Sequence, residues 1–258
     1  MESIKNIVII GAGNVGSHLS RALFASGFTI SQVAGRKEAA VKALAKEVQA
    51  SHTLSFDKII TGQDIYLMAL PDEVMDEVLP LLPLKDELLV HTSGSVPMGI
   101  LSPYSENTGV FYPLQTFTSN RDIDMTKVPV MVEANRIDNE HRLLEMGQKL
   151  SEKVMVLHSA QRHYMHIAAV FASNFSNHMY EIARQIMEEN GLDFGLLAPL
   201  IMETAAKATS MGPGKAQTGP ASRNDLKIIA KHLEFLDHND AARELYRRIS
   251  ESIIEQKK

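Results

Sequence analysis

The sequence predicts an α/β domain with a mostly parallel sheet, followed by an all-helical domain. Short apolar runs typical of buried strands alternate with helical patterns over residues 1–157. A glycine-rich turn follows the first of these runs, and no convincing strand pattern occurs over residues 158–258. We therefore place the boundary between the two domains at 157/158, and 258 residues suffice for two domains of ordinary size.

The expected strands of the first domain are apolar runs, and they cover residues 5–10, 28–35, 64–70, 87–94, 107–113, 128–134 and 153–158. Helical patterns lie between several of these runs, over residues 14–27, 37–48, 71–82 and 138–150. Gly27 is suited to end the first helix, and Pro71 is suited to the first turn of the third. This alternation indicates a parallel sheet with helices on both faces.

The second domain is expected to contain only helices, which cover residues 163–190, 194–211, 223–236 and 239–256. Gly191 directly follows the first of them, where a glycine commonly ends a helix.

The composition describes a globular protein without a basic surface. The net charge is -5 and the pI is near 6.1, which argues against a nucleic-acid partner. The lack of cysteine excludes disulfides and zinc–thiolate sites and suits a reducing compartment. No apolar run reaches the roughly 18 residues of a membrane span, and "MESIKNIVIIGAG" lacks the pattern of a signal peptide. We therefore expect a cytoplasmic protein with no membrane partner.

A glycine-rich turn connects the first predicted strand to the first predicted helix. Gly11, Gly13 and Gly16 form the pattern G-x-G-x-x-G, which encloses Asn14 and Val15. The first glycine permits a tight turn, the second lets the backbone approach a pyrophosphate, and the third lets helix pack against strand. The helix N-terminus offers free N–H groups to the phosphates. The turn predicts a Rossmann-like domain in which these five residues bind a dinucleotide; a purely structural turn is the alternative.

The end of the second predicted strand indicates which dinucleotide is bound. NAD-binding domains place an acidic residue there to hold the ribose hydroxyls, whereas NADP-binding domains supply cations for the 2′-phosphate. Here Gly35, Arg36 and Lys37 follow the strand. A planar guanidinium suits a phosphate, so we expect NADP(H), with Arg36 as the main contact and Lys37 as support. The alternative is a solvated basic start of the next helix.

Ligands of an open α/β sheet bind beyond the carboxyl ends of its strands. The third predicted strand ends in "ALPD", and we expect Leu70 and Pro71 to form an apolar surface against the cofactor.

Two further segments follow strands at the same edge. In "HTSGS" we expect His91, Thr92 and Ser93 to face the nicotinamide ribose or the substrate, with ordinary turn chemistry as an equally good interpretation. In "FYPLQTF" we expect Gln115 to bind the substrate.

The first helix of the second domain carries an unusual polar surface. Residues 163–180 contain no Asp, Glu, Lys or Arg. At about 100° per residue, one sector roughly 140° wide holds the uncharged polar side chains His163, His166, Ser173, Asn174, Asn177 and His178. A solvated face would carry Lys and Glu, and a buried face would avoid so many polar groups. The sector indicates the border of a cleft; buried polar groups with backbone or dimer partners are the alternative.

In the cleft interpretation, His166 is the candidate general acid/base, because imidazole exchanges a proton near neutral pH. Asn174 orients the substrate, and His163 is the reserve candidate for either role. A metal site built on His158, His163 and His166 lacks an H-E-x-x-H pattern, so we expect no metal. A serine hydrolase is excluded because no G-x-S-x-G sequence occurs.

The segment "SMGPGKAQTGPASRND" connects two predicted helices. Thr218, Ser222 and Arg223 lie close to a helix start near Asp225, where an anionic group could be held. We expect Thr218, Ser222 and Arg223 to contact the substrate. The alternative is that the segment only connects the two helices.

Several of these segments carry a family resemblance. "GAGNVGSHL", "HTSGS", "YPLQTF", "HIAAVFASNF" and "QTGPASRND" resemble a bacterial family in which a Rossmann-like NADP-binding domain precedes a C-terminal domain of unknown function. The chain is also similar to the 6-phosphogluconate dehydrogenase-like superfamily, which includes pyrroline-5-carboxylate reductase and deazaflavin-dependent NADP oxidoreductases. The resemblance implies a helical second domain of that type, which often dimerises. The β-hydroxyacid dehydrogenases of the superfamily use a catalytic Lys on this first long helix, but the sequence has none between His163 and Tyr180.

These features predict an NADP-dependent oxidoreductase that moves a hydride to or from a small carbonyl, imine or hydroxyacid substrate. A catalytically silent NADP-binding or interaction module is the alternative, since a fold does not itself imply chemistry. The small residues of "HIAAVFASNF" permit close helix approach, so we expect a homodimer through the helical domain.

Overall fold

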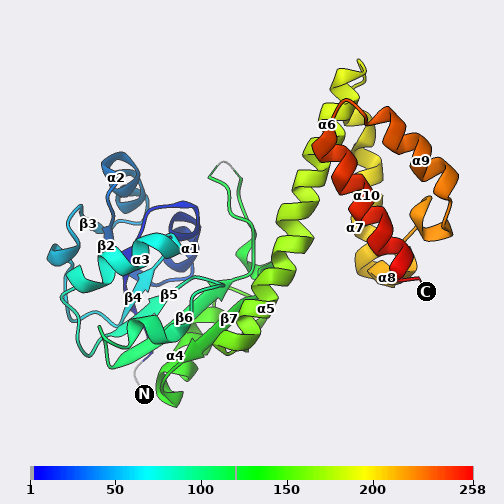
Figure 1. Cartoon of the computed structure of the whole chain (residues 1–258). Coiled ribbons are helices and arrows are strands. Elements are labelled where there is room, and N and C mark those ends of the chain that lie inside the picture. Colours follow the sequence, from blue (N-terminus) through cyan, green and yellow to red (C-terminus); the bar gives the residue numbers. More distant parts are fainter. Residues whose placement is uncertain (1–2, 120, 258) are drawn as a thin grey trace. The chain divides into compact units, whose positions relative to one another are not determined.

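An eight-stranded sheet forms the centre of the first part of the molecule in the computed structural model, which describes residues 3–119 and 121–257 (Figure 1). Its strands are β1 (Asn6–Ile10), β2 (Thr29–Ala34), β3 (Ser51–Thr53), β4 (Ile65–Met68), β5 (Leu88–His91), β6 (Asn107–Pro113), β7 (Val130–Ala134) and β8 (Val154–Val156). They lie in the order β3-β2-β1-β4-β5-β6-β7-β8. Only β6 and β7 pair antiparallel, which confirms the mostly parallel sheet expected from the sequence.

The predicted strands are all present, and β3 is an additional one that the apolar pattern missed. Its three residues, "SHT", are polar or small, and they pair with β2 in the register Gln32↔Ser51. An edge strand needs one neighbour's backbone and little apolar surface, so this strand left no hydrophobic signal.

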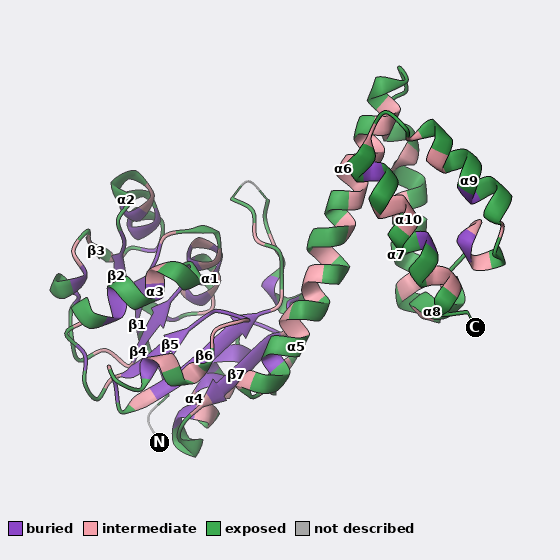
Figure 2. Ribbon diagram, viewed as in Figure 1, coloured by how far each residue is buried: buried purple, intermediate pink, exposed green. Residues whose placement is uncertain are grey.

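Helices cover the sheet of this first unit. They are α1 (Asn14–Ala25), α2 (Glu38–Glu47), α3 (Asp72–Val78), α4 (Ile137–Gln148) and α5 (Ser159–Ala169), with 3₁₀ turns at Phe56–Lys58, Leu79–Leu81, Met98–Leu101 and Met125–Lys127. Ile7 and Ile9 of β1 belong to one apolar core, and Val8 and Ile10 to the other. Successive strand residues point to opposite faces, so one short strand supplies both cores. Figure 2 shows the sheet almost entirely buried.

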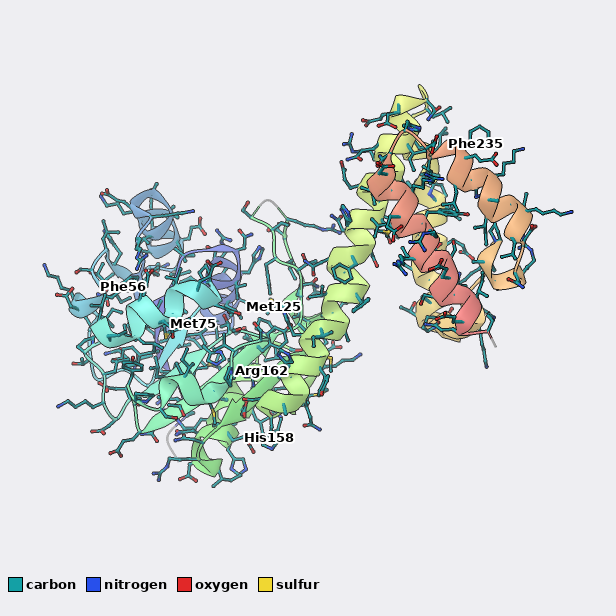
Figure 3. The ribbon with its side chains drawn as sticks, viewed as in Figure 1. Phe56, Met75, Met125, His158, Arg162 and Phe235 are labelled. Atoms are coloured by element: carbon teal, nitrogen blue, oxygen red, sulfur yellow. The ribbon has the colours of Figure 1, made fainter. Side chains whose placement is uncertain are left out.

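A buried ion pair joins α5 to the sheet. Arg162 of α5 is 1% exposed, and its guanidinium donates to the Glu133 carboxylate of β7. The same guanidinium donates to the Val96 carbonyl at 2.6 Å, and Ser159 Oγ donates to Glu133 Oε2 at 2.8 Å. Arg162 therefore holds α5, β7 and the turn after β5 together; Figure 3 marks it where α5 meets the sheet.

The predicted helix over residues 163–190 begins earlier, at Ser159, and contains a π-helical segment, Val170–Phe175. Hydrogen bonds of the i→i+5 type turn the chain less per residue than an α-helix does. The predicted single polar sector is therefore wrong beyond Val170, because Asn174 and Asn177 do not keep α-helical spacing from His166. The chain divides into compact units Met1–Asn174 and Phe175–Lys258, whereas the sequence boundary at 157/158 falls just after β8.

The second unit is helical over its described residues, as predicted. It contains α6 (Ser176–Glu189), α7 (Ala198–Met211), α8 (Pro213–Ala216), α9 (Leu226–Phe235) and α10 (Asp240–Glu255), with 3₁₀ turns Phe194–Leu197 and Ala221–Arg223. Gly191 follows α6 with a φ of 69°, a conformation that suits glycine. None of the described helices is both long and apolar enough to cross a membrane.

We predict that Arg162→Met lowers the free energy of unfolding by about 3–5 kcal/mol, because it leaves the Glu133 carboxylate buried without its partner. Urea unfolding followed by circular dichroism measures this loss. Arg21→Met is the control, since Arg21 forms an exposed pair with Glu47 and should cost less than about 1 kcal/mol. Equal losses in the two variants would show that the buried pair does not anchor α5.

Candidate active site

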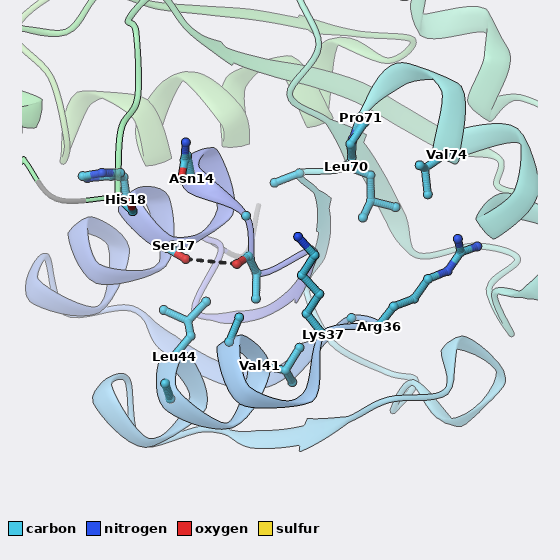
Figure 4. A pocket seen from close by; sticks show the side chains of 18 of the residues that line it. Asn14, Ser17, His18, Arg36, Lys37, Val41, Leu44, Leu70, Pro71 and Val74 are labelled. Carbon is cyan, nitrogen blue, oxygen red and sulfur yellow. Dashed lines mark hydrogen bonds between the residues drawn. The ribbon is translucent and has the colours of Figure 1, made fainter.

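A cleft of ≈ 540 Å³ opens at the carboxyl ends of β1, β2 and β4, between α1 and α2 (Figure 4). We call it the glycine cleft. Its lining includes Gly11, Gly13, Asn14, Ser17, Gly35, Arg36, Lys37, Leu70 and Pro71. The glycine turn and the basic segment after β2 therefore meet in one cleft, together with the apolar pair predicted from "ALPD".

The three glycines of the turn have different physical roles. Gly11 has a φ of 114°, and a Cβ there would meet the Ala69 carbonyl oxygen at 2.3 Å. A Cβ at Gly16 would meet the Gly11 carbonyl oxygen at 2.0 Å. A Cβ at Gly13, by contrast, would have no neighbour within 4 Å. The outer glycines allow close packing, and the backbone at Gly13 is open to a ligand in the cleft.

Two basic side chains after β2 extend in different directions. Arg36 pairs with Glu77 at 2.7 Å, and its guanidinium lies 5.9 Å from the centre of the Phe56 ring. Lys37 forms no ion pair with any residue that the structure describes, and Figure 4 shows it reaching into the cleft. The lining acid Glu47 is paired with Arg21 at 2.6 Å. Free N–H groups at the start of α1, space at Gly13 and nearby cations suit a dinucleotide with an extra phosphate.

A second cleft of ≈ 270 Å³ adjoins the first, since Leu70 lines both. We call it the histidine cleft. Its lining consists of Val15, Leu70, Asp72, Thr92, Ser93, Gly94, Ser95, Tyr112, Pro113, Gln115, Phe117 and His166. The structure therefore brings together the predicted site residues Val15, Thr92, Ser93, Gln115 and His166, which come from four separate segments of the chain.

Hydrogen bonds organise the polar groups of the histidine cleft. Tyr112 Oη lies 3.1 Å from His166 Nδ1. Ser95 Oγ donates to the Asp72 carboxylate and lies 3.2 Å from Ser93 Oγ. Asp72 is the one carboxyl group among the lining residues, which include no Lys or Arg.

The loop after β6 closes one side of these clefts. The Asn14 side chain donates to the Phe117 carbonyl at 3.0 Å, and His18 Nε2 donates to the Thr118 carbonyl at 2.9 Å. Phe117 lines the histidine cleft and Ser119 lines the glycine cleft, so α1 holds this loop beside both.

His91, which we expected to face the ribose or the substrate, is fully buried and lines neither cleft. Its Nδ1 accepts a hydrogen bond from the Ser93 N–H at 3.2 Å. Burial, and next the positive charge of Arg162, lower the pKa of His91 to about 4, so the ring is neutral at physiological pH. Side chains alternate between the two faces of the sheet along β5, and the His91 side chain points into the protein interior instead of toward a ligand. There it supports the turn after β5 through its hydrogen bond with the Ser93 N–H.

The remaining predicted residues lie elsewhere. His163 and Asn174 are exposed and line neither cleft. Thr218, Ser222 and Arg223 belong to the second unit, where Asp225 accepts from the Ile228 N–H and begins α9. Their substrate contacts stay predictions. No group of three or more metal-ligating side chains occurs among residues 3–119 and 121–257.

The sequence interpretation missed Tyr112, Asp72 and Ser95. Each stands in a segment already singled out, directly at or after the carboxyl end of a strand. A polar residue near the carboxyl end of a strand was the sequence signal that could have identified them. Only the three-dimensional structure shows which of these side chains line the same cleft.

A dinucleotide-type glycine cleft joined to a small polar cleft defines the class of nicotinamide-dependent oxidoreductases. The family model described as NADP oxidoreductase coenzyme F420-dependent matches residues 6–94, and that described as Domain of unknown function (DUF2520) matches residues 128–253. A proposed NADP oxidoreductase from Bacteroides fragilis is 38% identical, with 98% of each chain covered and a TM-score of 0.91. The chain therefore belongs to the NADP oxidoreductase family in which these two domains are combined. This confirms the family and the enzyme class expected from the sequence.

More distant structures share the fold alone. An imine reductase from Myxococcus stipitatus in complex with NADP⁺ is 15% identical, with 97% of this chain and 92% of that chain covered and a TM-score of 0.66. A 1-pyrroline-5-carboxylate reductase from Streptococcus pyogenes is 11% identical, with 99% of each chain covered and a TM-score of 0.65. A comparison with curated proteins gave no match.

Proposed function

We propose that this protein transfers a hydride between NADP(H) and a small substrate that contains a carbonyl or imine group. The observation that carries the proposal is the junction at Leu70, where the glycine cleft meets a cleft that holds His166. When bound, NADP(H) supplies or accepts the hydride. The residues of the histidine cleft orient the substrate and exchange its proton.

The cofactor is proposed to be NADP(H) rather than NAD(H). The backbone at Gly13 and the start of α1 would hold the pyrophosphate, with Arg36 and Lys37 at the 2′-phosphate. The Arg36–Glu77 pair does not oppose this role, because it is exposed and such pairs contribute only about 0–1 kcal/mol. The guanidinium can therefore exchange the carboxylate for a phosphate at little cost.

His166 is the proposed general acid/base. It is the one histidine that lines the histidine cleft, and imidazole can give and take a proton near neutral pH. A proton on the substrate oxygen or nitrogen balances the charge that develops there when hydride reaches the adjacent carbon. The geometry favours His166 over His163; Asn174 and the segment with Thr218, Ser222 and Arg223 stay proposed substrate contacts.

The charge of the histidine cleft favours an imine or a neutral carbonyl compound. Asp72 contributes a negative charge, and no Lys or Arg of the lining is present to pair with a substrate carboxylate. A hydroxyacid or oxo acid would meet like charge in this wall. The imine reductase fold neighbour supports the same preference by analogy alone.

We also propose that the helical unit forms a homodimer. Its described residues leave large apolar side chains exposed, including Leu200 at 62%, Met202 at 71% and Phe235 at 70%. No residue of α7 is buried. Apolar surface of this extent marks an interaction site, and a second copy of the chain is the commonest partner of a soluble enzyme.

We predict that the wild-type protein binds NADPH more tightly than NADH. Arg36→Ala should weaken NADPH binding about tenfold, or about 1.4 kcal/mol, and leave NADH binding unchanged. Gly13→Ala should weaken both cofactors equally, because its Cβ occupies the open backbone approach without meeting protein atoms. Cofactor titration by fluorescence measures the three proteins. Lys42→Ala on α2 is the control, and equal wild-type affinities would contradict the cofactor proposal.

We predict that a cofactor-saturated screen finds turnover with cyclic imines or neutral carbonyl compounds rather than oxo acids. His166→Gln should lower turnover about 100-fold or more while NADPH affinity stays unchanged, because it removes proton exchange alone. His163→Gln, which changes the exposed histidine one turn away, should retain turnover. If the cofactor binds and every substrate is inert, the protein is a catalytically silent NADP-binding module.

We predict a dimer at micromolar concentration in sedimentation velocity. Met202→Glu should shift the distribution toward monomer, since it places a charge in the exposed apolar surface. Lys85→Glu, an exposed change in the first unit, controls for added negative charge. A monomeric wild-type protein would refute the proposed dimer.

A further inference from the structure

Tyr112 and His166 form a hydrogen-bonded pair in the wall of the histidine cleft. Tyr112 is at the carboxyl end of β6 and is 8% exposed, whereas His166 is half-buried on α5. The 3.1 Å contact joins Tyr112 Oη to His166 Nδ1, and the rings meet edge to face at 67°. Among the residues that the structure describes, His166 is the only hydrogen-bond partner of this hydroxyl, and His166 Nε2 has no partner.

The hydroxyl keeps its own proton. Burial raises the pKa of Tyr112, although the charge of Arg162 acts in the opposite direction. The group is therefore a neutral hydroxyl at physiological pH, with one proton to donate and lone pairs to accept. It can donate to a neutral imidazole at Nδ1, and it can accept from Nδ1–H when the ring is an imidazolium.

Backbone packing fixes the side of the ring that faces Tyr112. A Cβ at Gly94 would meet His166 Nδ1 at 2.6 Å and Tyr112 Cζ at 2.8 Å. The turn after β5 thus lies directly against both rings, and only a glycine fits there. Nδ1 is enclosed by Tyr112 and Gly94, which leaves Nε2 as the ring nitrogen available to a ligand.

The helix that carries His166 is itself anchored. Arg162 lies one helical turn before His166, and its guanidinium binds Glu133 and the Val96 carbonyl. Because the same turn after β5 contains Gly94, the ring, the turn and the sheet form one connected arrangement.

We propose that Tyr112 is a positioning residue for His166, whose Nδ1 it holds so that Nε2 exchanges the proton with the substrate. This inference rests on the proposed function. In the reductive direction, the Nε2–H bond of the imidazolium breaks and its proton bonds to the substrate oxygen or nitrogen as hydride bonds to carbon. The ring becomes neutral with its proton on Nδ1, which donates to Tyr112 Oη. No bond to Tyr112 is made or broken, and oxidation reverses the transfer.

A hydroxyl suits this role better than a carboxylate does. A carboxylate partner accepts only, so it favours the charged imidazolium. A hydroxyl is neutral and accepts from Nδ1–H both before and after the Nε2 proton leaves, so it keeps the orientation of His166 without stabilising the charged ring as a carboxylate would.

Tyr112→Phe tests the proposal, because it removes the hydroxyl and retains the ring. Long-range ¹H–¹⁵N spectra of the protein without substrate report the hydrogen bonding of each ring nitrogen, and His166→Gln assigns the signals. In the wild type we expect a hydrogen-bonded Nδ1; in Tyr112→Phe the His166 signals should resemble those of exposed His163. We also expect kcat to fall about tenfold, with KM and NADPH affinity unchanged, because an unfixed ring reaches the productive orientation less often.

Tyr104→Phe is the matched control, since Tyr104 is half-buried in the first unit and lines neither cleft. It should change neither the spectra nor kcat, and circular dichroism checks that both variants fold. Unchanged His166 signals or an unchanged kcat in Tyr112→Phe would overturn the positioning role. Failure of the proposed function would appear differently, as a wild-type protein that binds NADPH and turns over nothing; the spectra would then still decide whether Tyr112 fixes the ring.

Discussion

The buried pair of Arg162 and Glu133 is the interaction on which the arrangement of the site depends. Two charges taken out of water are costly unless each finds close partners, and here Ser159 and the Val96 carbonyl complete the set. Such a network tolerates little displacement, because a small shift leaves a buried charge without a partner. It therefore fixes α5 on β7, and it places His166 one turn further along the same helix, beside the turn after β5.

The direction of the strands explains why the site lies at one edge. β1, β4, β5 and β6 run parallel, so the glycine turn, Asp72, the Ser93–Ser95 turn and Tyr112 all emerge at their carboxyl ends. β7 then reverses direction, so the chain after β6 turns back at this edge instead of crossing to the other. The connecting loop stays beside the clefts, where Asn14 and His18 hold it by its carbonyl groups.

Sequence patterns predicted most of the fold because they report local physics. Apolar runs and glycine positions were enough for seven of the strands, the order of the helices and the glycine turn. The pattern failed where a backbone partner replaced apolar burial, as at β3, and where an i→i+5 turn broke the helical period, as at Val170–Phe175. It also could not tell which side of β5 faces the cleft, so His91 was taken for a ligand-facing residue although it is buried.

The sequence by itself determined the α/β class, the dinucleotide turn, the basic segment after the second strand and His166 as a candidate base. These follow from residue types at short separations along the chain, where spacing alone sets the chemistry. Only the tertiary structure decided that Tyr112 is the partner of His166, that Gly94 must be small, and that Asp72 gives the second cleft its charge. Those relations join residues far apart in the sequence, and long-range packing, which no local pattern records, brings them within hydrogen-bond distance.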